Sequence, residues 1–453
     1  MKTYQDLQRV GENEQARMDF VKSVIEWHKT TDLYKTALVA DDYYKRRNRT
    51  ILDYQKWLTK ATGEIVPDVY TANYKLCSNF YGRFTTQLVQ YLLGNGISFS
   101  EDDTLDKLGN DFEHKVQTAT RNALTGAVSF GYWNLDHLEV FPVTEFAMLL
   151  DEETGMIRAG VRFWQLEASK PLRAVFYEED GFTEYQWTNG KGEVTQDKRP
   201  YILNIQYTEN DGEEIIEGEN YPTFPIIPLW CDDTHQSTLI GLRNNIDAYD
   251  LIKSGFCNTV DEASIVYWTI QNAGGMDEVD LSQFLYRIKN LHGAFVDDNA
   301  TAEPHSIDPP FEGRDKLLDR IRADLYEDAM ALDTKNIANG AVTATQIKAS
   351  YEPINSKADE LEYQVTAFIE KILELAGIED VPTYTRSKIV NTQEEIEMVI
   401  SSAQYLNDEY IAKKILELLG DADKQDEVLT GLVEDRLIGY DRATDNEALG
   451  EEA

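Results

Sequence analysis

Cysteine is scarce in this sequence, which has only Cys77, Cys231 and Cys257 among its 453 residues. An odd number of widely spaced cysteines does not make a disulfide framework, and it fits a reducing compartment. We therefore expect three small, buried side chains.

Long apolar runs are also missing: no stretch approaches the roughly 18 apolar residues of a membrane span, and the N-terminal run MKTYQDLQRVGENEQ lacks the apolar core of a signal peptide. The sequence predicts a soluble, cytoplasmic protein.

Enzyme signatures are missing as well. The sequence has neither a G-x-x-x-x-G-K-[ST] phosphate loop nor an H-E-x-x-H motif, and the glycines of TNGKGE do not form a dinucleotide fingerprint. Its six histidines are scattered, and none lies at metal-ligand spacing from another histidine or a cysteine. Adjacent carboxylates such as Asp232 and Asp233 could do acid–base chemistry, but such neighbours arise by chance among 81 acidic residues. We expect no catalytic residue, no metal and no cofactor.

Positive charge is in short supply, with 43 lysines and arginines against 81 acidic residues, a net charge of −38 and a pI of about 4.4. Proteins that wrap nucleic acid gain affinity by replacing phosphate counterions with basic side chains, so this chain is not expected to bind nucleic acid with its whole surface. One run is strongly basic, with Lys45, Arg46, Arg47 and Arg49. It could be a nucleic-acid patch or an exposed strip that pairs with the acidic surface of a neighbouring subunit, and we favour the second.

What is present is ample apolar and aromatic surface, at 42 % and 11 % of the residues, which is enough for a folded core. Apolar residues at helical spacing predict three helices in the first part of the chain. They lie around Met18 to Ile25, from Asn73 with Cys77 and Phe80 on one face, and from about Asp106 to Leu124. After Gly126 the pattern changes to short strands, with hairpin turns at residues 151–155 and 180–181. Helices placed before a mixed antiparallel sheet predict an α+β body.

Two long helices are predicted beyond this body. The first covers about residues 239–263 and the second opens near Arg314, each with a narrow apolar stripe and heavily charged sides. Between them lies a compact insertion with a β-like run SIVYWTI, a short helix near Leu281 to Ile288 and a strand HGAFV. Helices with one narrow apolar stripe bury it best when they pack side by side with helices of other copies in an oligomer.

The remaining chain is mostly helical. The run DTKNIANGAVTAT, residues 333–345, has no apolar face and is predicted to be a loop. A helix follows from Gln346, bent or restarted at Pro353 because proline removes a backbone donor, and it ends at Gly377. Further helices are expected beyond Pro382, before an acidic end, DNEALGEEA.

In order along the chain, five runs resemble one known family, the portal proteins or head-to-tail connectors of tailed bacteriophages, of the long-tailed siphophage type. The similarity lies in the sequence of parts rather than in an invariant motif. The runs are DDYYKRRNRTIL, QLVQYLLGNGISF, LTGAVSFGYWNL followed by FPVTEFAMLLDE, FPIIPLW leading into LIGLRNNIDAYDLIKSGFCNTVDEA, and VTATQIKASYEPINSKADELEYQVTAFIEKIL.

The resemblance implies a ring-forming portal fold with named parts. They are a wing at 1–235, stem helices at 236–263 and 313–333, a small α/β clip at 264–312, a tunnel loop at 334–345, a tunnel or wing helix at 346–382, and a helical crown with an acidic tail at 383–453. It also implies a non-enzymatic function, namely a ring at one capsid vertex, commonly a dodecamer, through which double-stranded DNA is packaged and ejected.

The implied location is the capsid vertex of the virion, after assembly in the host cytoplasm. The implied partners are other copies of the chain, the terminase large subunit, a head-completion adaptor, scaffold and major capsid protein, and DNA that passes without sequence specificity. No membrane is involved.

The resemblance also assigns residues to these parts. The DNA-facing tunnel loop would contain Lys335, Asn336, Asn339 and Gly340, for which plain loop polarity is an equal alternative. Stem packing would use Leu242, Ile246, Tyr249, Leu318, Ile321 and Leu325. The clip interface would use Trp268, Phe284, Tyr286, Arg287 and Phe295.

Two alternatives stay open at this point. A different virion ring or adaptor protein would share oligomerisation but lack a helix–insertion–helix unit. An acidic polysaccharide hydrolase would fit the aromatic content and would need two carboxylates that converge in a cleft.

Overall fold

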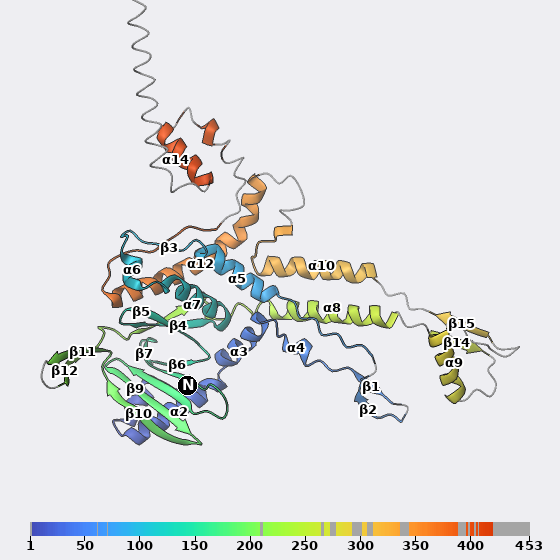
Figure 1. Cartoon of the computed structure of the whole chain (residues 1–453), viewed down its shortest axis with the longest axis horizontal. Helices are drawn as coiled ribbons and strands as arrows, with labels where there is room; N and C mark the ends of the chain where they lie inside the picture. The colour runs from blue at the N-terminus through green and yellow to red at the C-terminus, as the bar shows by residue number, and fades with distance from the viewer. Residues whose placement is uncertain are drawn as a thin grey trace, which may run out of the picture. The chain divides into compact units, whose positions relative to one another are not determined.

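The computed structural model describes residues 2–60, 62–69, 71–208, 212–263, 267–271, 278–291, 301–305, 311–335, 344–387, 396, 399–402, 405 and 407–419 (Figure 1). The chain divides into two units. The first unit comprises Met1–Ala331 and Ser356–Arg386, and the second comprises Leu332–Asn355 and Ser387–Ala453. Helices and strands are both abundant, and all the strand pairs in the described ranges are antiparallel, which confirms the α+β class.

The first unit begins with four helices, α1 Tyr4–Val10, α2 Glu14–Thr30, α3 Asp32–Tyr44 and α4 Arg49–Leu52. Side-chain oxygens of Thr3, Asn13 and Thr31 cap the first three by accepting backbone N–H groups that have no partner within the helix. One face of α2, with Val21, Val24 and Ile25 fully buried, packs against a sheet of five strands. The predicted helix around Met18 to Ile25 is confirmed.

That sheet is a meander in the order β10-β9-β8-β7-β6. Its strands are β6 Phe146–Leu150, β7 Ile157–Trp164, β8 Leu172–Glu178, β9 Gly181–Thr188 and β10 Lys191–Arg199. Both predicted hairpin turns are present. In the first, Asp151 Oδ1 accepts the backbone N–H groups of Glu153 and Thr154, and Gly155 takes a φ of 70°.

A second sheet, in the order β13-β4-β5, lies against helices (Figure 1). Its strands are β13 Ile226–Trp230, β4 Val128–Asn134 and β5 His137–Pro142, and the helices α5 Phe80–Leu93 and α7 Phe112–Gly126 precede it in the chain. The single helix expected from Asp106 to Leu124 is instead two, α6 Thr104–Leu108 and α7, because Gly109 adopts a φ of 90° between them.

Three small two-stranded sheets complete the body. They pair β1 Trp57–Thr59 with β2 Ile65–Pro67, β3 Ile97–Ser98 with β16 Thr383–Tyr384, and β11 Ile202–Thr208 with β12 Gly212–Glu219. The cysteines are free, and of the three only Cys231 is fully buried, so the expectation of three buried cysteines is wrong for the half-buried Cys77 and Cys257.

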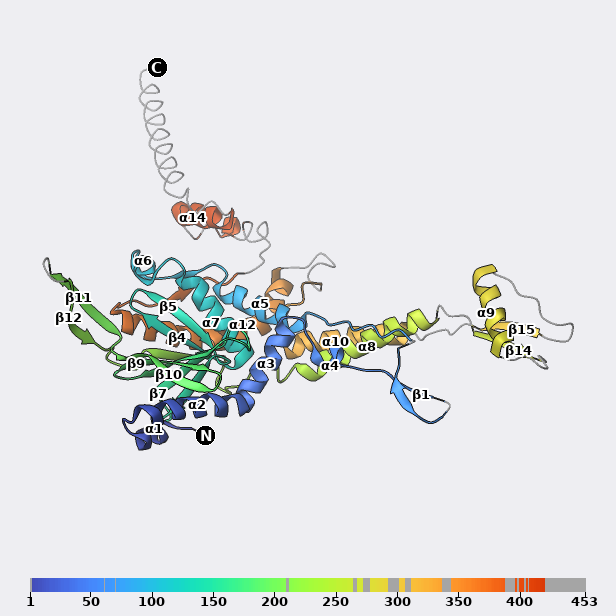
Figure 2. The ribbon, with the colours of Figure 1, turned by 60° about the horizontal axis from the view of Figure 1, so that its bottom comes forward.

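Two long helices, α8 Arg243–Ala263 and α10 Phe311–Asp328, pack along each other in the first unit. They bracket β14 Tyr267–Gln271, α9 Glu278–Leu291 and β15 Thr301–His305, of which β14 and β15 pair (Figure 2). The helix–insertion–helix order is therefore as predicted. The strand expected at HGAFV lies outside the described residues, and the partner of β14 is β15, which the sequence pattern did not indicate.

The last long helix, α12 Ala344–Ala376, continues through Pro353 without a restart. Its residues from Ser356 onward belong to the first unit, where Val365, Phe368 and Ile372 are buried. In the second unit, α14 Asp408–Leu419 is the longest described helix beyond Pro382.

Phe368 of α12 fits against Gly131 of β4, and this contact generates a prediction. A Cβ on Gly131 would come within 2.4 Å of the Phe368 ring, and overpacking of this kind costs about 1–3 kcal/mol. Gly131→Ala should lower the free energy of unfolding in urea by that amount. Gly313→Ala is the matched control, since a Cβ there meets nothing within 4 Å. Equal stability of the two variants would contradict the packing described.

Candidate functional site

The start of α8 and the end of α10 are fixed by a hydrophobic cluster within the chain. Leu242, Ile246 and Leu325 are buried there together with side chains of α3 and α5, and Tyr249 and Ile321 pack at its edge. The predicted stem-packing residues thus come together, apart from the half-buried Leu318. They do so within one chain, so their burial is a property of the fold.

A second face of α8 is polar and holds an extended segment. The backbone N–H groups of Tyr74, Leu76 and Ser78 donate in turn to Asn258 Oδ1, Ser254 Oγ and Asp250 Oδ1, over 2.7, 3.0 and 2.8 Å. We call this arrangement the polar ladder. Its three acceptor side chains are all more than nine-tenths buried.

The spacing of the polar ladder follows from elementary geometry. Positions four apart on a helix rise by about 6.0 Å, and positions two apart on an extended segment are about 6.6 Å apart. Acceptors at every fourth residue of α8 can therefore meet every second N–H of an extended chain. This explains why the helix expected from Asn73 begins only at Phe80, because the amides of Tyr74, Leu76 and Ser78 bond to α8 rather than to their own helix.

The polar ladder continues into a network around the start of α4. Asn48 Nδ2 donates to Asp247 Oδ1 at 2.9 Å and to Asp250 Oδ2 at 3.0 Å. Asp247 also accepts the hydroxyls of Tyr43 and Thr50. Burial raises the pKa of Asp250, and the hydrogen bonds from Asn48 and Ser78 oppose that effect. The network ties α3, α4 and α8 together.

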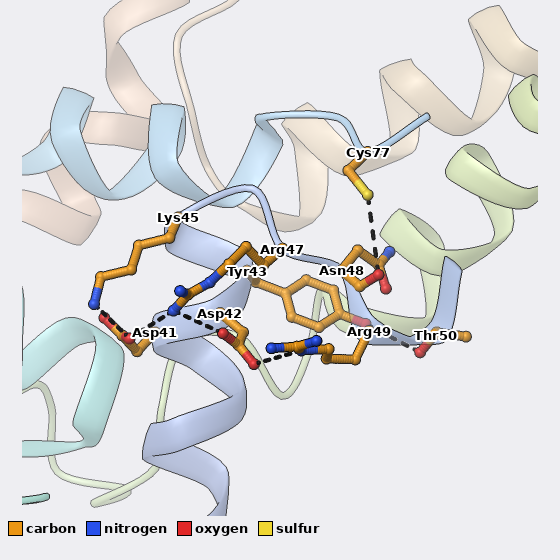
Figure 3. A network of polar contacts seen from close by, with 9 residues as sticks. All are labelled: Asp41, Asp42, Tyr43, Lys45, Arg47, Asn48, Arg49, Thr50 and Cys77. Atoms are coloured by element: carbon orange, nitrogen blue, oxygen red, sulfur yellow. Dashed lines mark hydrogen bonds and ion pairs between the residues drawn. The ribbon is translucent and has the colours of Figure 1, made fainter. Parts of the chain in front are cut away.

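The basic run lies in this same region and is largely neutralised within the chain (Figure 3). Lys45 pairs with Asp41 at 2.7 Å, Arg47 with Asp42 at 2.8 Å, and Arg49 with Asp42 at 3.3 Å. These pairs are exposed, so each contributes little to stability. They nevertheless give three of the four cations a carboxylate partner in their own chain, which neither of the two predicted roles foresaw.

Arg46, the fourth cation, is placed differently. It adopts a φ of 60° and lines an open groove of about 670 Å³ together with Arg83 and Lys253. No carboxylate is among the residues that line this groove. The region therefore carries one cationic hollow in a strongly acidic chain.

The other predicted residues are only partly placed. Lys335 is exposed, and its backbone N–H donates to Asp333 Oδ1 at 3.1 Å, whereas Asn336, Asn339 and Gly340 lie outside the described residues. In the insertion, Phe284 of α9 is buried, Tyr286 and Arg287 are exposed, Trp268 lies on β14, and Phe295 lies outside the described residues.

Nothing within the described ranges gathers catalytic or metal-binding groups. Asp232 Oδ1 accepts from the backbone N–H and hydroxyl of Thr234, and Asp233 accepts from Gln364, so both carboxylates hold local structure. No three metal-ligating side chains cluster in these ranges. None of the described helices is both long enough and apolar enough to cross a bilayer.

The polar ladder is the feature that sequence reasoning missed. A signal was present, since Asp250, Ser254 and Asn258 recur at every fourth position of a predicted helix. Small polar residues at that spacing on a predicted helix indicate a row of acceptors. The partner segment carries no comparable signal, because it contributes only backbone amides.

The raised pKa of Asp250 generates a prediction about pH. Between the ordinary value of 3.8 and the raised value, the folded chain binds more protons than the unfolded chain, so this group lowers stability as pH rises through that window. Asp250→Asn removes the titration. Its amide oxygen can still accept the Ser78 N–H, while its amide nitrogen loses the bond from Asn48 Nδ2, a cost that does not depend on pH. The difference in unfolding free energy, variant minus wild type, should therefore rise with pH across the window.

Urea titrations at a series of pH values measure that difference. Asp315→Asn is the control, an exposed aspartate on α10 whose substitution should leave a nearly constant difference. A difference for Asp250→Asn that stays flat or falls with pH would contradict the assignment.

Comparison with known proteins adds evidence from sequence. Residues 25–429 match the family model for the phage portal protein, SPP1 Gp6-like. The portal protein of Clostridium phage phiCD119 is 23 % identical over 403 residues, which cover 81 % of this chain and 85 % of that protein. The portal protein of Bacillus phage SPP1 is 20 % identical over 419 residues, which cover 84 % and 79 %.

Among solved structures, a chain from the neck of an empty gene transfer agent particle aligns with a TM-score of 0.46 at 9 % identity, covering 75 % of this chain and 90 % of that one. A chain from the virion of the native gene transfer agent aligns with a TM-score of 0.44 at 11 % identity, covering 74 % and 89 %. The family match alone spans most of the sequence, and from it we conclude that the chain belongs to the SPP1 Gp6-like phage portal proteins, which are structural components of the virion's portal vertex and not enzymes.

Proposed function

We propose that copies of this chain form a closed ring, a dodecamer, around a channel through which double-stranded DNA is packaged and later ejected. The observation that carries the proposal is the helix–insertion–helix unit of α8, β14-α9-β15 and α10 in a member of the portal family. In such a ring α8 and α10 would be the stem at residues 236–263 and 313–333, and the insertion at 264–312 would be the clip.

The other parts follow in the same proposal. Residues 1–235 would form the wing, residues 334–345 the tunnel loop with Lys335 facing the DNA, residues 346–382 the tunnel or wing helix, and residues 383–453 the crown. The clip, with Tyr286 and Arg287 exposed on α9, would dock the terminase large subunit and later the head-completion adaptor. Scaffold and major capsid protein would surround the ring.

The charge of the chain supports a channel that binds the passing DNA only weakly. A dodecamer of chains with a net charge of −38 would carry on the order of several hundred negative charges. Phosphates within about 8 Å of an acidic wall are repelled at physiological ionic strength. DNA could then slide, with contacts restricted to isolated cations such as Lys335.

The two alternatives left open by the sequence are excluded on different grounds. The family match over residues 25–429 removes the hydrolase. A generic virion ring or adaptor would lack the helix–insertion–helix unit, and α8, the insertion and α10 occur in that order.

The first test is an electron micrograph of the assembled protein viewed along its axis. We expect radial symmetry around an axial hole wide enough for a duplex. Assembly should be examined with scaffold and capsid protein present, because a portal chain on its own can remain monomeric. Particles without a central pore under those conditions would refute the proposal.

The tunnel loop is tested by deletion of residues 336–340. We expect rings and thermal stability like those of the wild type, with DNA packaging into capsids reduced at least tenfold. Replacement of the same five residues by glycine and serine is the matched control, because it keeps the loop length and removes the side chains. An unfolded product would show that the segment belongs to a core, and normal packaging by both variants would remove the loop from the DNA path.

A further inference from the structure

An unusual concentration of exposed apolar side chains lies between α4 and α5. We call residues 53–75 the apolar arm; it contains the β1–β2 hairpin and stands apart from the larger sheets (Figures 1 and 2). Trp57 is 63 % exposed, Ile65 66 % and Val69 76 %. Trp57 pairs with Pro67 and Thr59 with Ile65, so Trp57 and Ile65 lie on the same face of the hairpin.

The apolar arm is held in shape but not covered. Lys56 Nζ donates to the carbonyl of Ala72 at 2.7 Å, and Lys75 Nζ donates to the carbonyl of Leu52, which fixes the two ends of the arm. A lone two-stranded sheet is only marginally stable in water. An exposed apolar patch of this kind marks an interaction surface.

The size of the uncovered surface is comparable with half of a stable interface. Its large apolar side chains, which are Tyr54, Trp57, Leu58, Ile65, Val69 and Tyr74, are 41–76 % exposed. Given about 150–250 Å² for each fully buried aromatic side chain, they expose on the order of 600 Å² together. Standard interfaces bury about 800 Å² per partner.

The same chain presents a second apolar surface on α8, which is half-buried except for the exposed Leu251. Ala248, Leu251, Ile252 and Gly255 are spaced i, i+3, i+4 and i+7, which places them on one side of the helix. This side, which we call the outer stripe, differs from the side of Ile246 and from the side that makes the polar ladder. Leu251 is 47 % exposed, and a Cβ on Gly255 would meet nothing within 4 Å. A glycine in mid-helix weakens the helix, and no contact with the described residues requires one at position 255.

The charge of the apolar arm favours a second copy of the chain as its partner. The apolar arm carries Lys56, Lys60 and Lys75 against Asp53, Glu64 and Asp68, so its net charge is zero in a chain of −38. Copies of such a chain repel one another, and a neutral apolar segment is the part that can approach a neighbour without that cost.

We propose that the apolar arm of one copy lies over the outer stripe of α8 in the next copy of the ring. This inference rests on the proposed ring and adds the surfaces that close it. The contact is head to tail, so each copy gives an arm and receives one, which is the arrangement that generates closed rings. Ala248 and Gly255 leave room for the Trp57 indole between Leu251 and Ile252.

The first experiment removes the apolar character of the arm. In Trp57→Ser/Ile65→Ser both changed side chains are exposed in the single chain, so the melting temperature of the monomer should not change, whereas the fraction of chains in rings should fall at least tenfold by native mass spectrometry. The matched control is Met156→Ser/Leu166→Ser, which changes two side chains that are 65 % and 84 % exposed elsewhere on the body. Rings of the arm variant at the wild-type level would overturn the inference and leave the proposed function intact.

The second experiment tests the partner surface directly. Ile65→Cys copies with one affinity tag are mixed with Leu251→Cys copies carrying another, assembled, and oxidised. We expect a disulfide-linked product that contains both tags, well above the background of either variant alone. Rings without that product would overturn the inference, because they would show that the arm lies elsewhere. A wild-type chain that makes no rings even with scaffold and capsid protein present would instead remove the proposed function on which the inference rests.

Discussion

The attachment of α8 to the body is the constraint on which the rest of the structure depends. Three side chains of α8 accept the amides of Tyr74, Leu76 and Ser78, while Leu242 and Ile246, just before these acceptors, enter an apolar cluster with α3, α5 and α10. A buried N–H without an acceptor costs about 1–3 kcal/mol. The helix is therefore fixed both by apolar burial and by polar satisfaction, and its rotation about its own axis is determined.

That rotation decides which surfaces remain for neighbours. The stripe with Ile246 is used inside the chain, and so is the row of Asp250, Ser254 and Asn258. The outer stripe is what is left, with Leu251 half exposed. The packing of these helices side by side in an oligomer stays a prediction, and Leu242, Ile246 and Leu325 of the apolar stripes it used belong to the core of a single chain.

Much of the fold could be predicted from sequence, and the exceptions have physical causes. Apolar periodicity and turn residues correctly predicted α2, the hairpin at Asp151 to Gly155 and the two long helices around an insertion. In each case the structure favoured by the local sequence is also the one favoured by tertiary packing. The helix expected from Asn73 was wrong because its first residues bond to α8, a tertiary contact that local periodicity cannot report. The family could be recognised from the order of elements, whereas the polar ladder depends on a backbone partner nearly 200 residues away.

Electrostatics organises this acidic chain on two length scales. Over the whole molecule the excess of carboxylates keeps copies apart except where a neutral segment such as the apolar arm meets an uncharged surface. Near the start of α8, however, Asp41 and Asp42 neutralise Lys45, Arg47 and Arg49, so of the most basic run in the sequence it is Arg46 that contributes to the cationic groove. A run of basic residues therefore says little about nucleic-acid binding until the neighbouring carboxylates are counted, and in this protein those carboxylates lie near the end of α3, just ahead of the cations.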